Sequence, residues 1–542
     1  MDEAASQRAV IRALADAAFY SHRPTHVEHV QTHISHVFLA GPYVFKLKKA
    51  VRFPFLDFST LAQRLHFCRE ELRLNRRLSP AVYLDVVPIT RRTDGSLELD
   101  GTGEAIDYVL QMRRLPSDRL LPSLLARDAV TPAMMTALAH RLAAFHAEAP
   151  TGAEVDRHAS PEAVRTRWSD TIGILEPFAG TVVPRELHAI LADFGPRFIA
   201  QHEALLRQRQ VEQRIREGHG DLHAEHVCFV DAAAPASVDG SDALPTGIYV
   251  FDCLEFSMPL RCTDVVAEIA FLTMDLEMRG HRQLGAHFAD AYAAAAGDPR
   301  VPTLLPFYAS ARACVRAEVE CLTSRAPDLD DALRTAAAER AVRYAELAVR
   351  CAWRAQGPMV IACMGLSGTG KSTLAAGIAL ALDATVVRTD VLRKRSSVER
   401  GALQSDAVAY TAEARAKVYT TLASETDALL GAGRTVIADA TFLRRRDRDR
   451  LREVAHRRGV PCVFVESVAD PEQVRQRLDA RTIDDVSDAR WDTYVAQQDE
   501  AEPLDPREPT LRLRTDGATA DVQMTALLRL WQWRASCDAP HV

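Results

Sequence analysis

Apolar and polar positions alternate along the last third of the chain in a repeated strand–helix order. An unbroken apolar run at residues 358–364 predicts a buried parallel strand, and the alanine-rich pattern at 373–382 predicts a helix. The alternation continues with helical patterns near 409–431 and 446–458 and strand patterns near 435–439 and 461–466. Such a series predicts an α/β domain built on a doubly wound parallel sheet.

The first part of the chain has its strands early and its helices late. Residues 33–48 predict a hairpin of two strands that ends in lysines, and a helical pattern follows from about 59 to 78. Further strands are predicted near 82–90 and 105–112, and residues 260–350 are helical almost throughout. This order predicts an α+β domain whose last helix stops at Gly357-Pro358.

Length and composition are those of a globular protein with more than one domain. Single hydrophobic cores seldom exceed roughly 250–300 residues, so a chain of 542 residues predicts two or three domains. The formal net charge of −7 argues against general binding to nucleic acid or to anionic membranes. We therefore expect small molecules as partners.

The sequence shows no signal for targeting or for a membrane. The N-terminus is acidic, and no apolar run approaches the roughly 18–20 residues that cross a bilayer, so we expect a cytoplasmic protein. The ten cysteines are scattered without a Cys-x-x-Cys pair. This spacing indicates reduced, mostly buried thiols rather than disulfides or a zinc site.

One motif has a specific chemical meaning: Gly-x-x-x-x-Gly-Lys-Ser lies at 365–372, between the predicted strand and helix. In this context glycines let backbone amides turn inward around phosphates, and the helix directs its N-terminus at them. Lys371 is expected to reach the β- and γ-phosphates of ATP, and Ser372 to bind Mg²⁺. The candidate nucleotide-binding residues of this motif are Gly365, Leu366, Ser367, Gly368, Thr369, Gly370, Lys371, Ser372 and Thr373.

Two aspartates end strands of the same predicted sheet. Asp390 stands at the carboxyl end of a short strand, the edge of an open parallel sheet where ligands bind. It can accept the proton of an acceptor hydroxyl, and Arg393 can hold a substrate phosphate or carboxylate. Asp439 ends the strand near 435–439. It can bind Mg²⁺ through water or contact the acceptor, and both roles stay open.

The pattern Arg388-Thr-Asp-x-x-Arg393 resembles the second motif of the P-loop kinases that include polynucleotide kinase, zeta toxin and gluconate kinase. The resemblance implies a lid arginine that stabilises the transferring phosphate, with Arg481 as the first candidate and Arg477 as the second. Alternating arginines and aspartates at 444–450 are expected at the exposed start of a helix rather than on a nucleic-acid surface. The resemblance alone leaves a polynucleotide acceptor open.

A lysine strand followed by a glutamate helix is typical of the N-terminal lobe of protein kinases. Lys46 lies in the predicted hairpin and Glu71 in the helix that follows. In kinases such an ion pair holds the lysine on the α- and β-phosphates. Lys48 and Glu70 remain alternatives at a shift of one or two residues.

His219-Gly-Asp-Leu-His223 is similar to the catalytic loop of the aminoglycoside phosphotransferase and choline kinase group, and Phe251-Asp252 looks like its metal-binding segment. The resemblance covers roughly residues 30–345 and implies a two-lobed kinase-like fold, with an N-lobe at about 1–112 and a C-lobe at about 113–350. By position it implies that Asp221 accepts the proton of a substrate hydroxyl, that Asp252 holds Mg²⁺, and that Asp264 braces the catalytic loop.

His226 stands where this group has an asparagine that binds the metal. An asparagine oxygen is a hard ligand suited to Mg²⁺, whereas imidazole is softer and better suited to zinc or other transition metals. His219, His223 and His226 can also be interpreted as a metal cluster. We prefer the kinase interpretation because the aspartates at 221, 252 and 264 come in the kinase order.

The whole chain resembles bacterial fusion proteins that join an aminoglycoside-phosphotransferase-like domain, here 1–350, to a P-loop kinase domain, here 358–535. The resemblance implies an ATP-dependent kinase with two MgATP sites that phosphorylates hydroxyl groups of small acceptors. One alternative is that the first domain only binds nucleotide and regulates the second. Another is that the second domain hydrolyses ATP to drive a conformational change.

Overall fold

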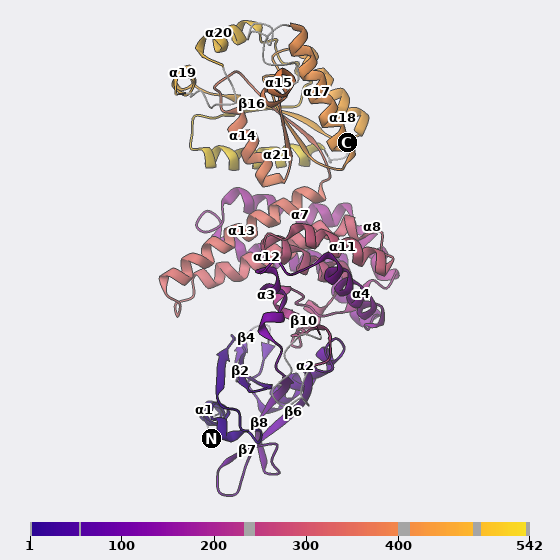
Figure 1. Ribbon diagram of the computed structural model, residues 1–542, viewed down its shortest axis with the longest axis vertical. Coiled ribbons are helices and arrows are strands. Elements are labelled where there is room, and N and C mark those ends of the chain that lie inside the picture. The colour runs from indigo at the N-terminus through magenta and orange to yellow at the C-terminus, as the bar shows by residue number, and fades with distance from the viewer. Residues whose placement is uncertain (1–2, 54–55, 232–243, 399–411, 481–488, 538–542) are drawn as a thin grey trace. The chain divides into compact units, whose positions relative to one another are not determined.

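The computed structural model describes residues 3–53, 56–231, 244–398, 412–480 and 489–537 (Figure 1). The chain folds into two compact units, the first made of residues 1–168 and 198–312 and the second of 169–197 and 313–542. The helices after residue 312 therefore group with the phosphate-loop sheet. The expected first domain, 1–350, had included them.

The first unit begins with a six-stranded antiparallel sheet in the order β1-β2-β3-β8-β6-β7. The predicted hairpin is present as β2 and β3, which pair Phe38 with Phe45. Because side chains alternate between the two faces of a strand, both phenylalanines join one core with Val10 and Leu14 of α1. The elements are α1 Glu3–Leu14, β1 Val27–Gln31, β2 Ser35–Ala40, β3 Tyr43–Lys48, β4 Arg52–Phe53, β5 Leu56–Asp57, α2 Leu61–Arg76, β6 Tyr83–Arg91, β7 Leu97–Leu99 and β8 Glu104–Arg113.

Helices follow this sheet, interrupted by two short antiparallel ribbons, β9 with β12 and β10 with β11. The segments after β9 and β11 carry the two predicted catalytic stretches. The sheet and the helical lobe have the two-lobed kinase-like fold that the resemblance implied. The elements between β8 and β13, among which most of α7 and all of α13 belong to the second unit, are α3 Leu121–Leu125, α4 Pro132–Glu148, α5 Ala153–Asp156, α6 Pro161–Leu175, α7 Arg185–Gln201, α8 Glu203–Val211, β9 Ile215–Glu217, β10 Val227–Val230, β11 Gly247–Val250, α9 Met258–Arg261, β12 Cys262–Asp264, α10 Val265–Met278, α11 Arg282–Ala296, α12 Val301–Ser324 and α13 Asp331–Ala355.

The second unit contains a five-stranded sheet in the order β14-β15-β13-β16-β17, and every pair of neighbours is parallel. Its central strand β13 is buried along its whole length, as the apolar run predicts. The α/β fold with a doubly wound parallel sheet is thus confirmed. The elements are β13 Val360–Met364, α14 Lys371–Leu382, β14 Thr385–Arg388, α15 Thr389–Val398, α17 Ala412–Gly431, β15 Val436–Asp439, α18 Arg445–Arg458, β16 Cys462–Val468, α19 Pro471–Asp479, α20 Trp491–Glu500, β17 Thr510–Arg514 and α21 Thr519–Cys537.

The prediction of an exposed helix start at 444–450 is wrong for two residues. Asp447 and Arg448 are buried, and the Arg448 side chain is fully inaccessible to solvent. Its guanidinium bonds to a carboxylate oxygen of Glu508 at 2.9 Å and to the backbone oxygens of Phe442 and Pro503. A buried charge is tolerated when it is paired and hydrogen-bonded in this way. Arg448 is therefore a structural residue and not part of a basic surface.

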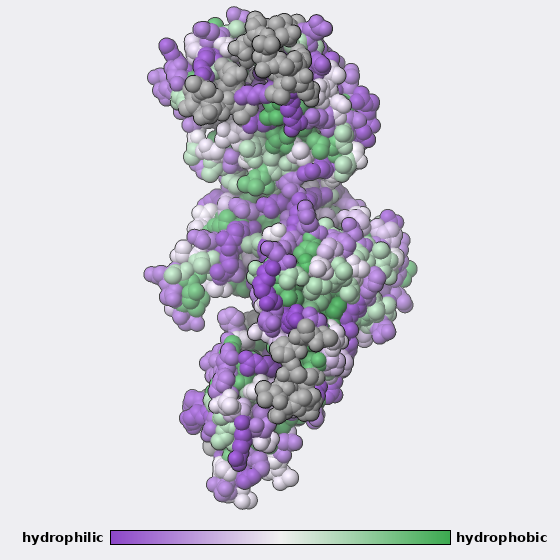
Figure 2. All heavy atoms as spheres, viewed as in Figure 1, coloured by the Kyte–Doolittle hydropathy of each residue, from purple (hydrophilic) through white to green (hydrophobic). Residues whose placement is uncertain are grey.

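Hydrophilic residues predominate on the face drawn in Figure 2, and hydrophobic ones lie in small scattered groups. Eight of the ten cysteines are buried, as their spacing indicated. None of the helices within the described ranges is long and apolar enough to cross a membrane.

Candidate active sites

The phosphate loop lies between β13 and α14 and depends on its glycines. Gly365 and Gly368 have φ angles of +135° and +83°, which side-chain-bearing residues rarely adopt. A Cβ on Gly365 would lie 2.6 Å from the Ser467 carbonyl oxygen, and one on Gly368 would lie 2.9 Å from Val474 Cγ1. The backbone conformation of this loop therefore requires glycine at both positions. The loop ends at the N-terminus of α14, where its backbone amides can bind an anion.

Lys371 bends back over this loop. Its Nζ donates to the Leu366 carbonyl oxygen at 2.8 Å. It lines two cavities of the second unit together with Ser372, so the lysine and the hydroxyl reach both.

The first cavity has a volume of about 360 Å³ and extends along α14 towards β17 and α21. Arg477 of α19 lines it and donates to the Thr515 carbonyl oxygen at 2.6 Å. The Thr515 hydroxyl donates in turn to the Thr369 carbonyl oxygen at 2.7 Å, which ties β17 to the phosphate loop. Arg481, the first candidate for a lid arginine, lies outside the described residues. Arg477, the second candidate, lies beside the loop.

The second cavity, of about 170 Å³, brings together the other predicted residues of this unit. Asp390, Arg393, Asp439 and Ser372 all line it. Arg393 donates to Asp390 at 3.0 Å, and the two side chains are separated by one helical turn of α15. The cavity lies at the carboxyl ends of the parallel strands, where the topology predicts a ligand.

Two arginines of this cavity were not predicted. Arg388 forms an ion pair with Asp439 at 3.1 Å, and Arg415 of α17 bonds to Glu500 at 2.5 Å. Arg388 had a signal, because it begins the motif that ends at Arg393. Arg415 had none, since it stands in an ordinary helical pattern and is brought to the cavity by the packing of α17.

The oxygen donors of the second unit fit a magnesium ion. The Ser372 hydroxyl and the Asp439 carboxylate line the same cavity, and both are hard ligands of the kind that Mg²⁺ prefers. Asp439 is buried at the end of β15 and is compensated by Arg388. Its role as metal ligand or acceptor contact stays a prediction.

In the first unit, Lys46 of β3 is held by two carboxylates. Its Nζ lies 2.8 Å from Glu71 of α2 and 2.6 Å from Asp252, so the ion pair expected between Lys46 and Glu71 is formed. Burial disfavours the charged ammonium, but Asp252 and Glu71 outweigh it and raise the pKa of Lys46 well above its usual value. The lysine therefore stays charged at neutral pH.

The two alternatives to this pair have other partners. Lys48 is almost fully buried and also binds Glu71, at 2.7 Å, while Glu255 is its second partner. Glu70 accepts hydrogen bonds from Arg73 and Arg261 instead. Glu71 is thus shared by two lysines, and Glu255 is a member of this cluster that the sequence did not reveal.

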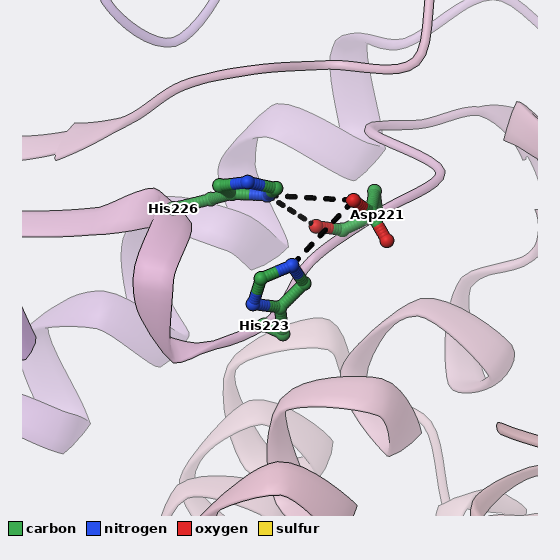
Figure 3. Close-up of side chains that lie close together, drawn as sticks. All are labelled: Asp221, His223 and His226. Atoms are coloured by element: carbon green, nitrogen blue, oxygen red, sulfur yellow. Dashed lines mark hydrogen bonds and ion pairs between the residues drawn. The ribbon is translucent and has the colours of Figure 1, made fainter. Parts of the chain in front are cut away.

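The loop after β9 brings His223 and His226 close to Asp221 (Figure 3), and the loop after β11 brings Asp252 close to His226 as well. His226 Nδ1 donates to the Asp221 backbone oxygen at 2.8 Å, and its Nε2 lies 3.6 Å from Asp252 Oδ2. His223 Nε2 lies 3.5 Å from Asp221 Oδ2. Burial opposes ionisation of Asp221, but its hydrogen bond with His223 and the charge of His226 hold its pKa well below the usual range. Asp221 is therefore ionised at neutral pH.

The predicted catalytic loop is braced by Glu268 of α10, a residue that the sequence did not single out. Its carboxylate accepts from the backbone amides of His219 and Gly220, the latter at 2.8 Å, and from His146 Nε2 at 2.6 Å. A Cβ on Gly218 would collide with the same carboxylate. Glu268 stands inside a helix of buried residues, so no local pattern distinguished it.

Asp264 was expected to brace this loop, and the structure gives it another task. It accepts two hydrogen bonds from the buried Arg209 of α8, at 2.8 and 2.7 Å. It also caps α10 by accepting from the Val266 amide at 2.9 Å. Asp264 thus joins α8 to the start of α10, and the brace on the loop amides comes from Glu268, one helical turn later.

Comparison with known proteins gives matches to both parts of the chain. A family model described as an AAA domain matches residues 360–502. A Mycobacterium tuberculosis protein described as uncharacterized, Rv2004c, is 33% identical over 420 residues, which are 76% of this chain and 78% of the relative. Among solved structures, a sugar kinase from Janibacter sp. HTCC2649 covers 34% of this chain and 99% of its own, with 25% identity and a TM-score of 0.26. A choline/ethanolamine kinase family protein from Mesorhizobium loti covers 63% of this chain and 99% of its own, with 13% identity and a TM-score of 0.35.

Proposed function

The chain belongs to the same family as the uncharacterized Mycobacterium tuberculosis protein Rv2004c, and from this premise we propose that it is an ATP-dependent phosphotransferase. In this proposal an aminoglycoside-phosphotransferase-like unit and a P-loop kinase unit each transfer the γ-phosphate of ATP to a hydroxyl group of a small acceptor. The observation that carries the proposal is the second cavity, where the phosphate-loop lysine and Ser372 meet Asp390 and Asp439.

The second unit supplies each element of phosphoryl transfer from its own residues. The loop amides and Lys371 bind the β- and γ-phosphates, while Arg477 lies beside the loop to neutralise charge that develops on the transferring group. Asp390 accepts the proton of the attacking hydroxyl, and Arg393 orients both Asp390 and an anionic group of the acceptor. A magnesium ion held by Ser372 and Asp439 would neutralise phosphate charge.

The first unit has a second set of residues for phosphoryl transfer, which is built differently. Lys46, positioned by Glu71, binds the phosphates of a second ATP, and Asp221 accepts the proton of the acceptor. Asp252 supplies a carboxylate for magnesium. The imidazole of His226 does not supply the hard oxygen donor of the related kinases, so it has no part in magnesium binding in this proposal.

One observation favours an alternative function for the first unit, namely nucleotide binding without transfer. His226 lies between Asp221 and Asp252, within 3.7 Å of a carboxylate oxygen of each. The imidazole of His226 stands where the related kinases have an oxygen ligand for the metal, between the proposed base Asp221 and the proposed metal ligand Asp252. In this alternative the first unit senses nucleotide and regulates the second.

The experiment is phosphate transfer from γ-labelled ATP to a fractionated metabolite pool by the full chain. We expect Asp390→Ala and Asp221→Ala to remove different labelled products, and the double variant to remove both. Asp492→Ala, on the exposed surface of α20, is the matched control and should leave both products. Products that survive the double variant would overturn the proposal. If Asp221→Ala removes no labelled product while the first unit still binds ATP, the result would support the alternative.

A further inference from the structure

Asp221, His223 and His226 form a compact group of ligand-type side chains (Figure 3). One ligand atom from each lies within 4.8 Å of the other two, and within the described ranges no other set of three His, Cys, Asp or Glu residues meets this criterion. A single turn of helix at 224–226 separates the histidines, and their ring centroids are 4.0 Å apart. Both rings therefore face one carboxylate.

The separations within the group are those of ligands around one ion. Asp221 Oδ2 lies 3.5 Å from His223 Nε2 and 3.7 Å from His226 Nδ1. Two ligands of a tetrahedral zinc ion with bonds of about 2.0–2.1 Å lie about 3.4 Å apart. Small movements of the three side chains would bring them to that spacing, and three protein ligands leave a fourth position open.

The surroundings of His226 suit a metal-bound imidazole. Its Nδ1 lies 3.7 Å from Asp221 Oδ2 and donates to the Asp221 backbone oxygen at 2.8 Å, while its Nε2 lies 3.6 Å from Asp252 Oδ2. A metal ion at Nδ1 would replace the bond to the backbone oxygen, and the ring hydrogen would then reside on Nε2, where the Asp252 carboxylate can accept it. A carboxylate behind a ligating histidine fixes the tautomer and makes the imidazole a better donor.

We propose that Asp221, His223 and His226 bind a divalent transition-metal ion of the zinc class, and that the bound ion stops phosphate transfer by the first unit. Two imidazoles and one carboxylate select such an ion over Mg²⁺, which prefers oxygen ligands. The bound ion is coordinated by the Asp221 carboxylate, which can then no longer accept the proton of the acceptor hydroxyl. Metal binding stands on the geometry alone, whereas the block of transfer rests on the proposed function.

The binding test uses the full chain, stripped of metal and free of nucleotide. Zn²⁺ is titrated against a chromophoric chelator, and Co²⁺ binding is followed by its visible ligand-field absorption, which reports nitrogen and oxygen ligands separately from thiolates. We expect wild type to bind one equivalent that excess Mg²⁺ does not displace. His223→Ala should weaken the affinity by roughly 100-fold or more, and Asp252→Asn by about 10-fold. His66→Ala, an exposed histidine of α2, is the control and should not change it.

Equal affinity in wild type and His223→Ala, or displacement of Zn²⁺ by equimolar Mg²⁺, would overturn the site. A cobalt spectrum dominated by thiolate charge transfer would overturn it as well.

The second test measures transfer in the Asp390→Ala chain, where only the first unit is expected to act. Zn²⁺ should lower this transfer over the same concentration range in which it binds. If Zn²⁺ binds without lowering transfer, the proposed inhibition would be wrong, but the proposed metal site would stand. Transfer that is absent from zinc-free wild type supplied with MgATP would contradict the proposed function instead, and the binding data would still decide the site.

Discussion

The two lysines that we propose to bind phosphate are held in different ways. Lys371 belongs to the phosphate loop, and its Nζ donates to a backbone carbonyl oxygen five residues earlier. Lys46 lies on a strand, and its Nζ bonds to carboxylates 25 and 206 residues away in the sequence. The second unit thus places its lysine through local backbone, and the first through long-range ion pairs. Disturbing the first site should therefore cost folding stability, and disturbing the second should cost mainly activity.

The largest expected effect is on the folding of the first unit. Glu71→Ala removes a carboxylate shared by Lys46, which is partly buried, and Lys48, which is almost fully buried. Breaking a buried ion pair from one side costs about 3–5 kcal/mol, because the partner keeps its charge without compensation. Urea unfolding monitored in the first unit should show this loss. Glu148→Ala, at an exposed position of α4, should lose almost nothing. A loss as small as that of the control would mean that Asp252 and Glu255 suffice to compensate both lysines.

The corresponding change in the second unit should affect turnover instead. Lys371→Ala removes a cation from the phosphates, and loss of one such electrostatic contact lowers kcat by about 100–1,000-fold. Its Nζ donates to the Leu366 carbonyl oxygen, and one such hydrogen bond contributes only about 1 kcal/mol to stability, so the midpoint of thermal unfolding should move little. Both quantities are measured in an Asp221→Ala background, with the exposed Lys417→Ala as control. A large drop in the unfolding midpoint would contradict the contrast between the two lysines.

A smaller effect is expected from pH on the stability of the first unit. His219 is fully buried, and burial, together with the charge of His226, lowers its pKa to about 4. The unfolded chain takes up a proton near pH 6.5 that the folded chain refuses until about pH 4, so stability falls as pH is lowered through this window. His219 should account for about 2 kcal/mol of the loss between pH 7 and pH 5.

The measurement is urea unfolding of the first unit at both pH values. His219→Gln keeps a donor for the Phe251 carbonyl oxygen but cannot be protonated. The variant should therefore lose about 2 kcal/mol less stability than wild type between pH 7 and pH 5. Equal losses in both proteins would assign the pH dependence to other groups.

The same contrast explains which parts of the molecule could be predicted from sequence. The phosphate loop is contiguous, so its spacing and its place between a strand and a helix identify it. The ion pair between Lys46 and Glu71 joins two neighbouring elements and could be expected from their order. The sharing of Glu71 with Lys48 and the entry of Glu255 could not, because they depend on how a loop near residue 255 packs against β3.

Buried charge was the hardest feature to predict. Arg448 lies in a run of alternating charges that is typical of an exposed helix, and the carboxylate that compensates it, Glu508, is 60 residues away. Glu268 is surrounded in sequence by apolar residues and has its partners on α4 and in the catalytic loop. In both cases the side chain is buried because of a distant partner, and a periodic pattern contains no information on such partners.

The contact between Glu268 and Gly218 has a consequence for divergence among related chains. The Glu268 carboxylate fills the space that any side chain at position 218 would need. A relative with a shorter residue at 268 has room for a Cβ at 218, but it loses the acceptor for the loop amides and for His146. We therefore expect these two positions to change together, with position 146 following, so that substitutions at the three sites are correlated across the family.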